Sequence, residues 1–196
     1  MTGFAVLGYA DSESGQSFDV AREKALLNGE ILLETRSHSA WGGAVTAWMY
    51  LPLERSQVWQ QVTDYPRWVQ YFPDLVCSEV LTHGEGLQGC KRLYQVAKKT
   101  FFMLSAQVEI YLKVIETVHT SARQQIQFRM ERGSFTDFSA ELKLQDHQSG
   151  TQSGTLLTYS VQATPTIPVP SVFIQEAMRL DLPANMRKMR QVICGR

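Results

Sequence analysis

Tyr159, Arg92 and Tyr94 are the side chains of this sequence whose types and positions could support acid–base chemistry. A phenol at Tyr159 could transfer a proton to a bound molecule, while Arg92 and Tyr94 could bind a carboxylate or carbonyl group. The sequence places no acidic or basic side chain beside Tyr159 on the same face of its strand. All three residues are therefore weak catalytic candidates. We favour the alternative in which Arg92 is an exposed residue on an edge strand.

Metal and thiol chemistry have little support in the sequence. His38, His83, His119 and His147 lack the HxxxH spacing of metal ligands, so we expect no metal and no cofactor. Three cysteines, Cys77, Cys90 and Cys194, form no CxxC pair. Their odd number is typical of buried free thiols in a reducing compartment.

The charge balance excludes several classes of protein. The chain has 196 residues, with 19 basic and 19 acidic side chains and 44% hydrophobic residues. This composition argues against disorder, and zero net charge argues against general nucleic-acid binding. The chain has no run of about 18 apolar residues, and its first residues do not resemble a signal peptide. We expect a cytoplasmic protein, with transient attachment to a membrane left open.

The elements that must position Tyr159 begin after an N-terminal arm. Residues 1–42 form this arm, with a short helix at 18–27 and an extra strand at 31–35, and one domain covers 43–196. A strand at 44–51 ends at Pro52. Two short helices follow: apolar residues recur at helical spacing in 53–65, and Pro66 begins a second helical turn that Pro73 ends.

Consecutive antiparallel strands are predicted for the middle of the chain. They cover 75–81, 89–97, 101–118, 125–131, 135–144 and 155–163, with a turn at Lys98 and Lys99. Eighteen extended residues would span about 60 Å, so residues 101–118 should contain a bend or bulge. A long helix at 171–193 then begins at Ser171 and contains Pro183, which should kink or interrupt it.

Alternation along the strands separates an apolar face from a polar face. The polar face of residues 101–118 carries Ser105, Gln107, Glu109, Lys113 and Glu116. Tyr159 is the only polar residue that we assign to the apolar face. A sheet with one apolar face needs a cover, and the C-terminal helix, about 35 Å long, is the remaining element that can supply it. The predicted fold is α+β: a curved antiparallel sheet of about six to seven strands wraps around this helix, with two short helices after the first strand.

Three segments carry a resemblance to a known family. They are VWQQVTDYPRWVQYFPDLVCSEVL at 58–81, GTQSGTLLTY at 150–159 and VPSVFIQEAMRLDLPANMRKMR at 169–190. With this order of elements, the chain resembles the START-like helix-grip (SRPBCC) superfamily of polyketide cyclases, aromatases and coenzyme Q-binding lipid carriers over residues 43–194. The resemblance implies a START/Bet v 1-like fold that binds an apolar or aromatic molecule between sheet and helix.

The resemblance and the strand patterning together predict a ligand pocket and its entrance. The pocket residues are Phe102, Leu104, Ala106, Val108, Ile126, Phe128, Met130, Phe138, Ala140, Leu142, Leu157, Tyr159, Phe173, Ala177 and Met178. The entrance residues are Trp68, Tyr71 and Phe72, on the two short helices, and Trp68 is expected to be the exposed one.

Three functions remain open, and we rank a non-catalytic carrier first. The carrier would bind a lipid, quinone, isoprenoid or polyketide-like molecule in an apolar cavity. The second is an aromatase/cyclase or dehydrase that uses Tyr159. The third is an assembly or interaction protein with a collapsed pocket. The expected partner is a hydrophobic small molecule, and the sequence indicates no specific protein partner.

Overall fold

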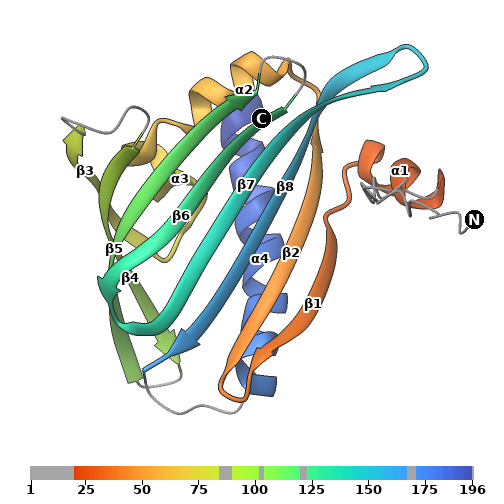
Figure 1. Ribbon diagram of the computed structural model, residues 1–196. Coiled ribbons are helices and arrows are strands. Elements are labelled where there is room, and N and C mark those ends of the chain that lie inside the picture. Colours follow the sequence, from red (N-terminus) through yellow and green to blue (C-terminus); the bar gives the residue numbers. More distant parts are fainter. Residues whose placement is uncertain (1–19, 84–89, 102–103, 120–122, 167–170, 196) are drawn as a thin grey trace, which may run out of the picture.

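A single eight-stranded antiparallel sheet forms the body of the protein (Figure 1). The structure, a computed structural model, describes residues 20–83, 90–101, 104–119, 123–166 and 171–195. The spatial order of the strands is β1-β2-β8-β7-β6-β5-β4-β3. The strands are β1 (Leu32–Ser39), β2 (Gly42–Leu51), β3 (Leu75–His83), β4 (Cys90–Phe101), β5 (Leu104–His119), β6 (Arg123–Gly133), β7 (Phe135–Ser149) and β8 (Gln152–Pro165).

The strand register explains how the sheet acquires one apolar face. Leu142 lies opposite Tyr159 on β8 and opposite Ile126 on β6, so side chains of the same kind meet across the strands. The face that carries these residues is called the inner face below. Helix α4 (Ser171–Cys194) packs against this face, mainly on β1, β2 and the short helix α3 (Trp68–Tyr71). The sheet therefore curves around a long C-terminal helix, which confirms the predicted helix-grip fold (Figure 1).

Gly43 allows α4 to approach the sheet closely. A Cβ atom at this position would lie 3.1 Å from Cγ of Gln175 and 3.2 Å from Sδ of Met178. These distances are shorter than ordinary van der Waals contacts. The absence of a side chain at Gly43 thus sets the spacing between the first half of α4 and strand β2.

Three short helical segments connect β2 to β3 and cover one end of the sheet. They are α2 (Arg55–Val62), the 3-10 helix η1 (Tyr65–Arg67) and α3. The backbone N–H of Glu54 donates to Oε1 of Gln57 at 3.2 Å, which satisfies one free donor at the start of α2. Pro66 lies in the first turn of η1, where a missing N–H costs no helical hydrogen bond.

A separate apolar cluster lies on the opposite, outer face of the sheet. Leu26 of α1 (Val20–Leu27) packs on Trp48, Tyr50 and Leu156, whose side chains point away from α4. The guanidinium of Arg22 lies 5.4 Å from the centre of the Trp48 ring. Strand β1 pairs with β2 along Leu32–Ser39, so this part of the N-terminal arm belongs to the same sheet.

Two details of the predicted strands differ from the structure. Lys98 and Lys99 do not form a turn: they pair with Gln107 and Ala106, and β4 continues to Phe101. Lysines suit this part of the hairpin because Lys98 is exposed. The irregularity expected in residues 101–118 occurs where Tyr111 pairs with Arg132 and Leu112 with Met130, so the extra residue is on β6. The C-terminal helix is not interrupted at Pro183: α4 is one continuous helix that contains this proline.

Candidate ligand-binding face

Burial of the inner face varies along the strands. Near α2, Leu144, Leu157, Ile126 and Val114 are fully buried. Towards the β6–β7 hairpin, Ile110 and Ala163 are buried, but four inner-face side chains beside them are half-buried: Val108, Met130, Phe138 and Val161. Ala177 and Met178 of α4 are half-buried as well. One end of the inner face is thus a packed core, and the other presents apolar side chains that the protein covers only in part.

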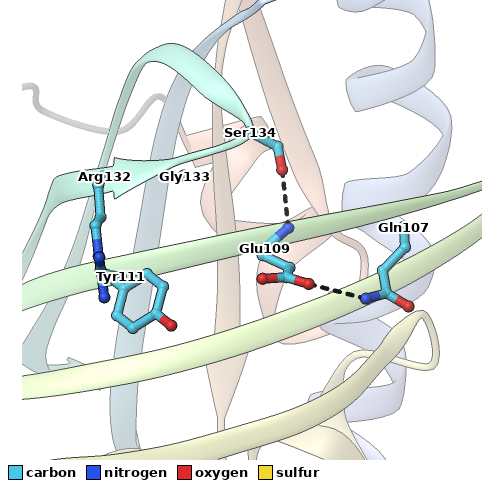
Figure 2. Close-up of a pocket in the computed structure, with 6 residues that line it drawn as sticks. All are labelled: Gln107, Glu109, Tyr111, Arg132, Gly133 and Ser134. Atoms are coloured by element: carbon cyan, nitrogen blue, oxygen red, sulfur yellow. Dashed lines mark hydrogen bonds between the residues drawn. The ribbon is translucent and has the colours of Figure 1, made fainter.

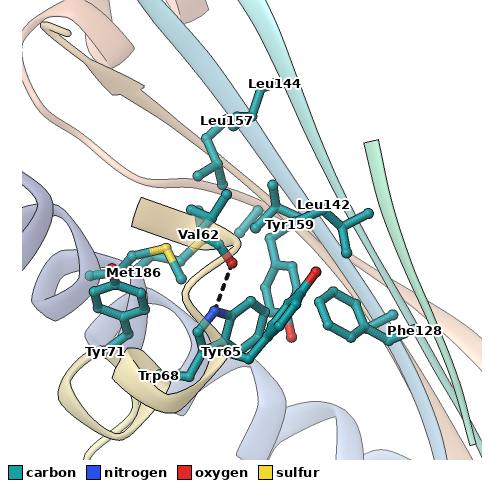
Figure 3. Close-up of a cluster of buried hydrophobic side chains, with 14 of the residues drawn as sticks. Val62, Tyr65, Trp68, Tyr71, Phe128, Leu142, Leu144, Leu157, Tyr159 and Met186 are labelled. Carbon is teal, nitrogen blue, oxygen red and sulfur yellow. Dashed lines mark hydrogen bonds between the residues drawn. The ribbon is translucent and has the colours of Figure 1, made fainter. Parts of the chain in front are cut away.

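An aromatic cluster lies between the short helices and the inner face of β6 and β8 (Figure 3). The Trp68 ring stacks on Phe72 with a centroid distance of 5.4 Å and lies 5.1 Å from the Phe128 ring. Both Trp68 and Phe72 also contact the ring of Tyr159. This cluster brings residues of the short helices against predicted pocket residues of β6 and β8.

The expectation that Trp68 is exposed is wrong. Its side chain is buried, and its indole Nε1 donates to the backbone oxygen of Val62 at 2.9 Å (Figure 3). Tyr71 is buried too, and its hydroxyl donates to the backbone oxygen of Gln61 at 2.9 Å. These two hydrogen bonds satisfy the polar ends of the rings and turn them inward, because a buried donor needs a partner. Of the three predicted entrance residues, Phe72 is the half-buried one.

Tyr159 lies in the centre of the inner face, as its alternation predicts, and is buried. Burial raises the pKa of its phenol above the ordinary value of a tyrosine. The phenol is therefore neutral at pH 7, where it can donate a hydrogen bond but cannot accept a proton as a base. Among the described residues, its hydroxyl has no hydrogen-bond partner. Tyr159 can therefore offer a hydrogen-bond donor to a bound molecule.

Sequence reasoning missed an ionic network on the inner face. Glu116 was assigned to the polar face, but it has the same parity as Val114 and pairs with Ile126, so it points inward. The hydroxyl of Tyr65 donates to Oε1 of Glu116 at 2.6 Å, and Nζ of Lys91 donates to the same oxygen at 2.7 Å. Lys91 shares its parity with the buried Leu93, and this signal could have placed it.

This network attaches η1 to strands β3, β4 and β5. The hydroxyl of Ser78 donates to the backbone oxygen of Tyr65 at 2.7 Å, and Nε2 of Gln95 donates to Ser78 at 3.1 Å. Burial and the adjacent Glu116 carboxylate raise the pKa of Tyr65. The negative charge of Glu116 is matched by Lys91, so this carboxylate is engaged in positioning Tyr65.

Arg92 and Tyr94 lie on the outer face, away from Tyr159. Arg92 forms an ion pair with Glu131, and its side chain is 51% exposed. The rings of Tyr94 and Tyr111 are 4.8 Å apart, and partial desolvation together with the Glu109 carboxylate raises the pKa of Tyr94. The structure does not bring these two residues together with Tyr159.

A shallow hollow of about 520 Å³ lies beside Tyr111 on this outer face (Figure 2). The guanidinium of Arg132 lies 3.9 Å from the centre of the Tyr111 ring. The backbone N–H of Glu109 donates to the hydroxyl of Ser134, and the Glu109 carboxylate accepts a hydrogen bond from Gln107. Apart from Arg132, which lies against the Tyr111 ring, the polar side chains of this hollow named here are thus paired within the protein.

Several sequence predictions lie outside what the structure describes. Phe102 is outside the described residues, and the side chains of Leu104, Ala106 and Phe173 are outside them as well. Cys77, Cys90 and Cys194 are not joined by a disulfide, and they are half-buried and not buried as expected. They lie near the edge of the sheet or the end of α4, where packing is less complete. Within the described residues, no helix is both long and apolar enough to cross a membrane.

Comparisons with known proteins agree with this geometry. The model of a family described as "Polyketide cyclase / dehydrase and lipid transport" matches residues 51–190. No protein with a curated description matches the sequence significantly.

Solved structures share the fold at low sequence identity. A STAR-related lipid transfer protein from Xanthomonas axonopodis is 13% identical, with a TM-score of 0.64 over 83% of this chain and 93% of that chain. Human STARD10 is 9% identical, with a TM-score of 0.62 over 83% of this chain and 73% of that chain. The Zhui aromatase/cyclase from Streptomyces sp. R1128 is 13% identical, with a TM-score of 0.53 over 83% of this chain and 93% of that chain. At these identities the similarity establishes the fold.

Proposed function

Because the chain belongs to the polyketide cyclase / dehydrase and lipid transport family, we propose that it is a carrier for a hydrophobic small molecule. The ligand, a lipid, quinone, isoprenoid or polyketide-like molecule, binds between the inner face of the sheet and the first half of α4. The observation that carries this proposal is the incomplete burial of the apolar side chains of Val108, Met130, Phe138 and Val161.

The chemistry of this end favours binding over catalysis. Exposed apolar surface is unfavourable in water, so a hydrophobic ligand that covers these side chains gains about 25 cal/mol for each Å² removed from water. The described inner-face residues nearest to it offer the single phenol of Tyr159, which stays protonated. A general acid–base reaction needs a group that exchanges protons near neutral pH.

Extraction and mass spectrometry test the carrier directly. The purified protein is extracted with organic solvent, and co-purifying molecules are identified; a stoichiometric lipid, quinone or similar molecule supports the proposal. Binding of a hydrophobic dye is then compared between Met130→Gln, on the inner face, and Arg129→Gln, its neighbour on the outer face. We expect at least a tenfold loss of affinity for Met130→Gln only.

Two outcomes would contradict the carrier. One is a protein that yields no extracted molecule and takes up no dye. The other is an equal loss of affinity in both variants. A ligand on the inner face should be affected by Met130 and not by Arg129, because the two side chains lie on opposite faces of β6. Circular dichroism checks that both variants keep the strand content of the parent protein.

A cyclase or dehydrase is the second candidate, and the unpartnered Tyr159 hydroxyl is the observation that favours it. The Zhui aromatase/cyclase shares the fold, and its title names such an activity for that protein. If polyketide-like substrates are turned over, Tyr159→Phe should lower the rate at least a hundredfold, since the remaining inner-face groups cannot replace the phenol. Unchanged turnover in this variant would exclude a Tyr159-dependent reaction.

A further inference from the structure

The outer face of the sheet contains a polar groove of about 420 Å³ across β1, β2, β8, β7 and β6. The strand register places Arg36 opposite Ala44, Ala44 opposite Gln162, Gln162 opposite Ser139 and Ser139 opposite Arg129. The small side chains of Ala44 and Ser139, with Ser160 in the next row, form its floor, and arginines stand at both ends. A hollow forms here because long side chains surround short ones on a continuous sheet.

The groove carries an excess of positive charge. Lys143 pairs with Glu141 at 2.6 Å, and Glu141 also accepts one hydrogen bond each from Gln125 and Gln127, so this carboxylate is engaged within the protein. In the described part of the chain, no carboxylate lies within ion-pair distance of Arg36 or Arg129. Two guanidinium groups of the groove are therefore available to a ligand.

The strand next to the groove strengthens this positive field. Lys113 of β5 lies directly opposite Arg129, and among the described residues it also has no carboxylate within ion-pair distance. Like charges that face each other on neighbouring strands destabilise a sheet. An anion placed between these cations would relieve their repulsion, and binding such an anion is a function that accounts for the arrangement.

We propose that this groove binds a phosphorylated small molecule that is free in solution. Four strand spacings separate Arg36 from Arg129, about 19 Å between backbones, so two long side chains that lean inward leave room for one or two phosphate groups. Guanidinium groups match phosphate oxygens with paired hydrogen bonds. The hydroxyl of Ser139 and the amide of Gln162 add donors along the floor, and the hydroxyl of Ser160 beside them is hydrogen-bonded to Thr46 at 3.0 Å.

Its size and surroundings favour a small ligand over a polymer. The volume lies within the usual range of small-molecule sites. The chain has zero net charge, and Glu131 neutralises Arg92 beyond Lys113, so the basic region is confined to the groove and its border. The groove is on the opposite face from the hydrophobic side chains of the proposed carrier site, so either proposal can fail without the other.

Titration calorimetry with inorganic pyrophosphate at constant ionic strength tests the groove. We expect one saturable site on the parent protein, with affinity at least tenfold weaker in Arg36→Gln and in Arg129→Gln and lost in the double variant. Arg187→Gln removes an exposed arginine of α4 and serves as the matched control, with affinity unchanged within about twofold. Dye binding at the inner face should be the same in all four variants.

Three results would overturn the proposal. They are no saturable heat with millimolar pyrophosphate, an equal loss in Arg187→Gln, and affinity for sodium sulfate equal to that for pyrophosphate. Vesicles that contain phosphatidylglycerol form a further arm of the test. Binding to vesicles that depends on Arg36 and Arg129, without binding of free pyrophosphate, would assign the groove to a lipid surface and reject a soluble ligand.

Discussion

At the scale of single residues, the contact between Tyr65 and Glu116 joins the short helices to the sheet. Tyr65→Phe removes a hydrogen bond to a charged carboxylate, which should lower the free energy of unfolding by about 1.5–3 kcal/mol. Tyr71→Phe is the matched control, because it removes a neutral hydrogen bond and should cost about 0.5–1.5 kcal/mol. Urea denaturation measures both, and equal losses would show that Glu116 adds nothing to the Tyr65 contact.

Buried tyrosines also make stability depend on alkaline pH. The pKa values of Tyr65 and Tyr159 are raised in the folded protein, so above pH 10 the unfolded chain loses protons that the folded chain retains. The free energy of unfolding should therefore fall as pH rises above 10, by up to about 1.4 kcal/mol per pH unit for each tyrosine. Below pH 10, neither tyrosine makes the free energy of unfolding depend on pH.

Tyr159→Phe separates one of these contributions. The variant should match the parent protein within about 1 kcal/mol at pH 7, because the hydroxyl has no partner among the described residues. Denaturation at pH 8, 10 and 11 should show a shallower alkaline loss in the variant. A parallel loss in both proteins would mean that Tyr159 ionises in the folded state as readily as in the unfolded state.

The residue scale also shows where sequence patterning is informative. Alternation placed Tyr159 and most apolar pocket residues on the inner face, because β7 and β8 pair without interruption from Asp137 to Ser149. It missed Lys91 and Glu116 because a charged side chain at an inward position is usually taken as a sign of the outer face. Trp68 was misplaced because its partner, the backbone oxygen of Val62, is set by the turn between α2 and η1.

At the scale of elements, Gly43 sets the distance between α4 and β2. Gly43→Val would place methyl groups against Gln175 and Met178, which should lower the free energy of unfolding by about 1–3 kcal/mol through overpacking. Ala44→Val changes the next residue, on the outer face and away from α4, and should cost less stability than Gly43→Val.

The double variant Gly43→Val/Gln175→Ala checks the cause of this loss. If the contact with α4 is responsible, shortening Gln175 should recover part of the stability, and a thermodynamic cycle should show favourable coupling. Strictly additive losses would point to a cause within β2.

Element order and the close packing of a C-terminal helix on the sheet follow from the sequence. The docking of α1 on Trp48, Tyr50 and Leu156 does not, because those residues read as part of a buried strand.

At the scale of the whole molecule, stability and ligand binding are assigned to opposite ends of the inner face. Leu142→Ala, in the packed end, should cost about 2–5 kcal/mol and leave dye affinity unchanged in the folded fraction. Val161→Ala, in the half-buried end, should cost about 1 kcal/mol or less but weaken the dye several-fold. Denaturation and fluorescence titration on the same samples measure both; similar profiles for the two variants would contradict this division.

The pairing of β2 with β8 has a consequence for the order of folding. Residues 43–51 pair with residues 155–163, so more than a hundred residues of chain separate the two partners. The strands from β3 to β8 pair with their neighbours in sequence and can form as local hairpins. The β1–β2 hairpin can also form locally, but it can join the sheet only once β8 is in place, and such long-range pairing slows folding to milliseconds or longer. Before that step, the apolar side chains of β2 lack their cover, and in a chain emerging from the ribosome they are the segment most exposed to aggregation.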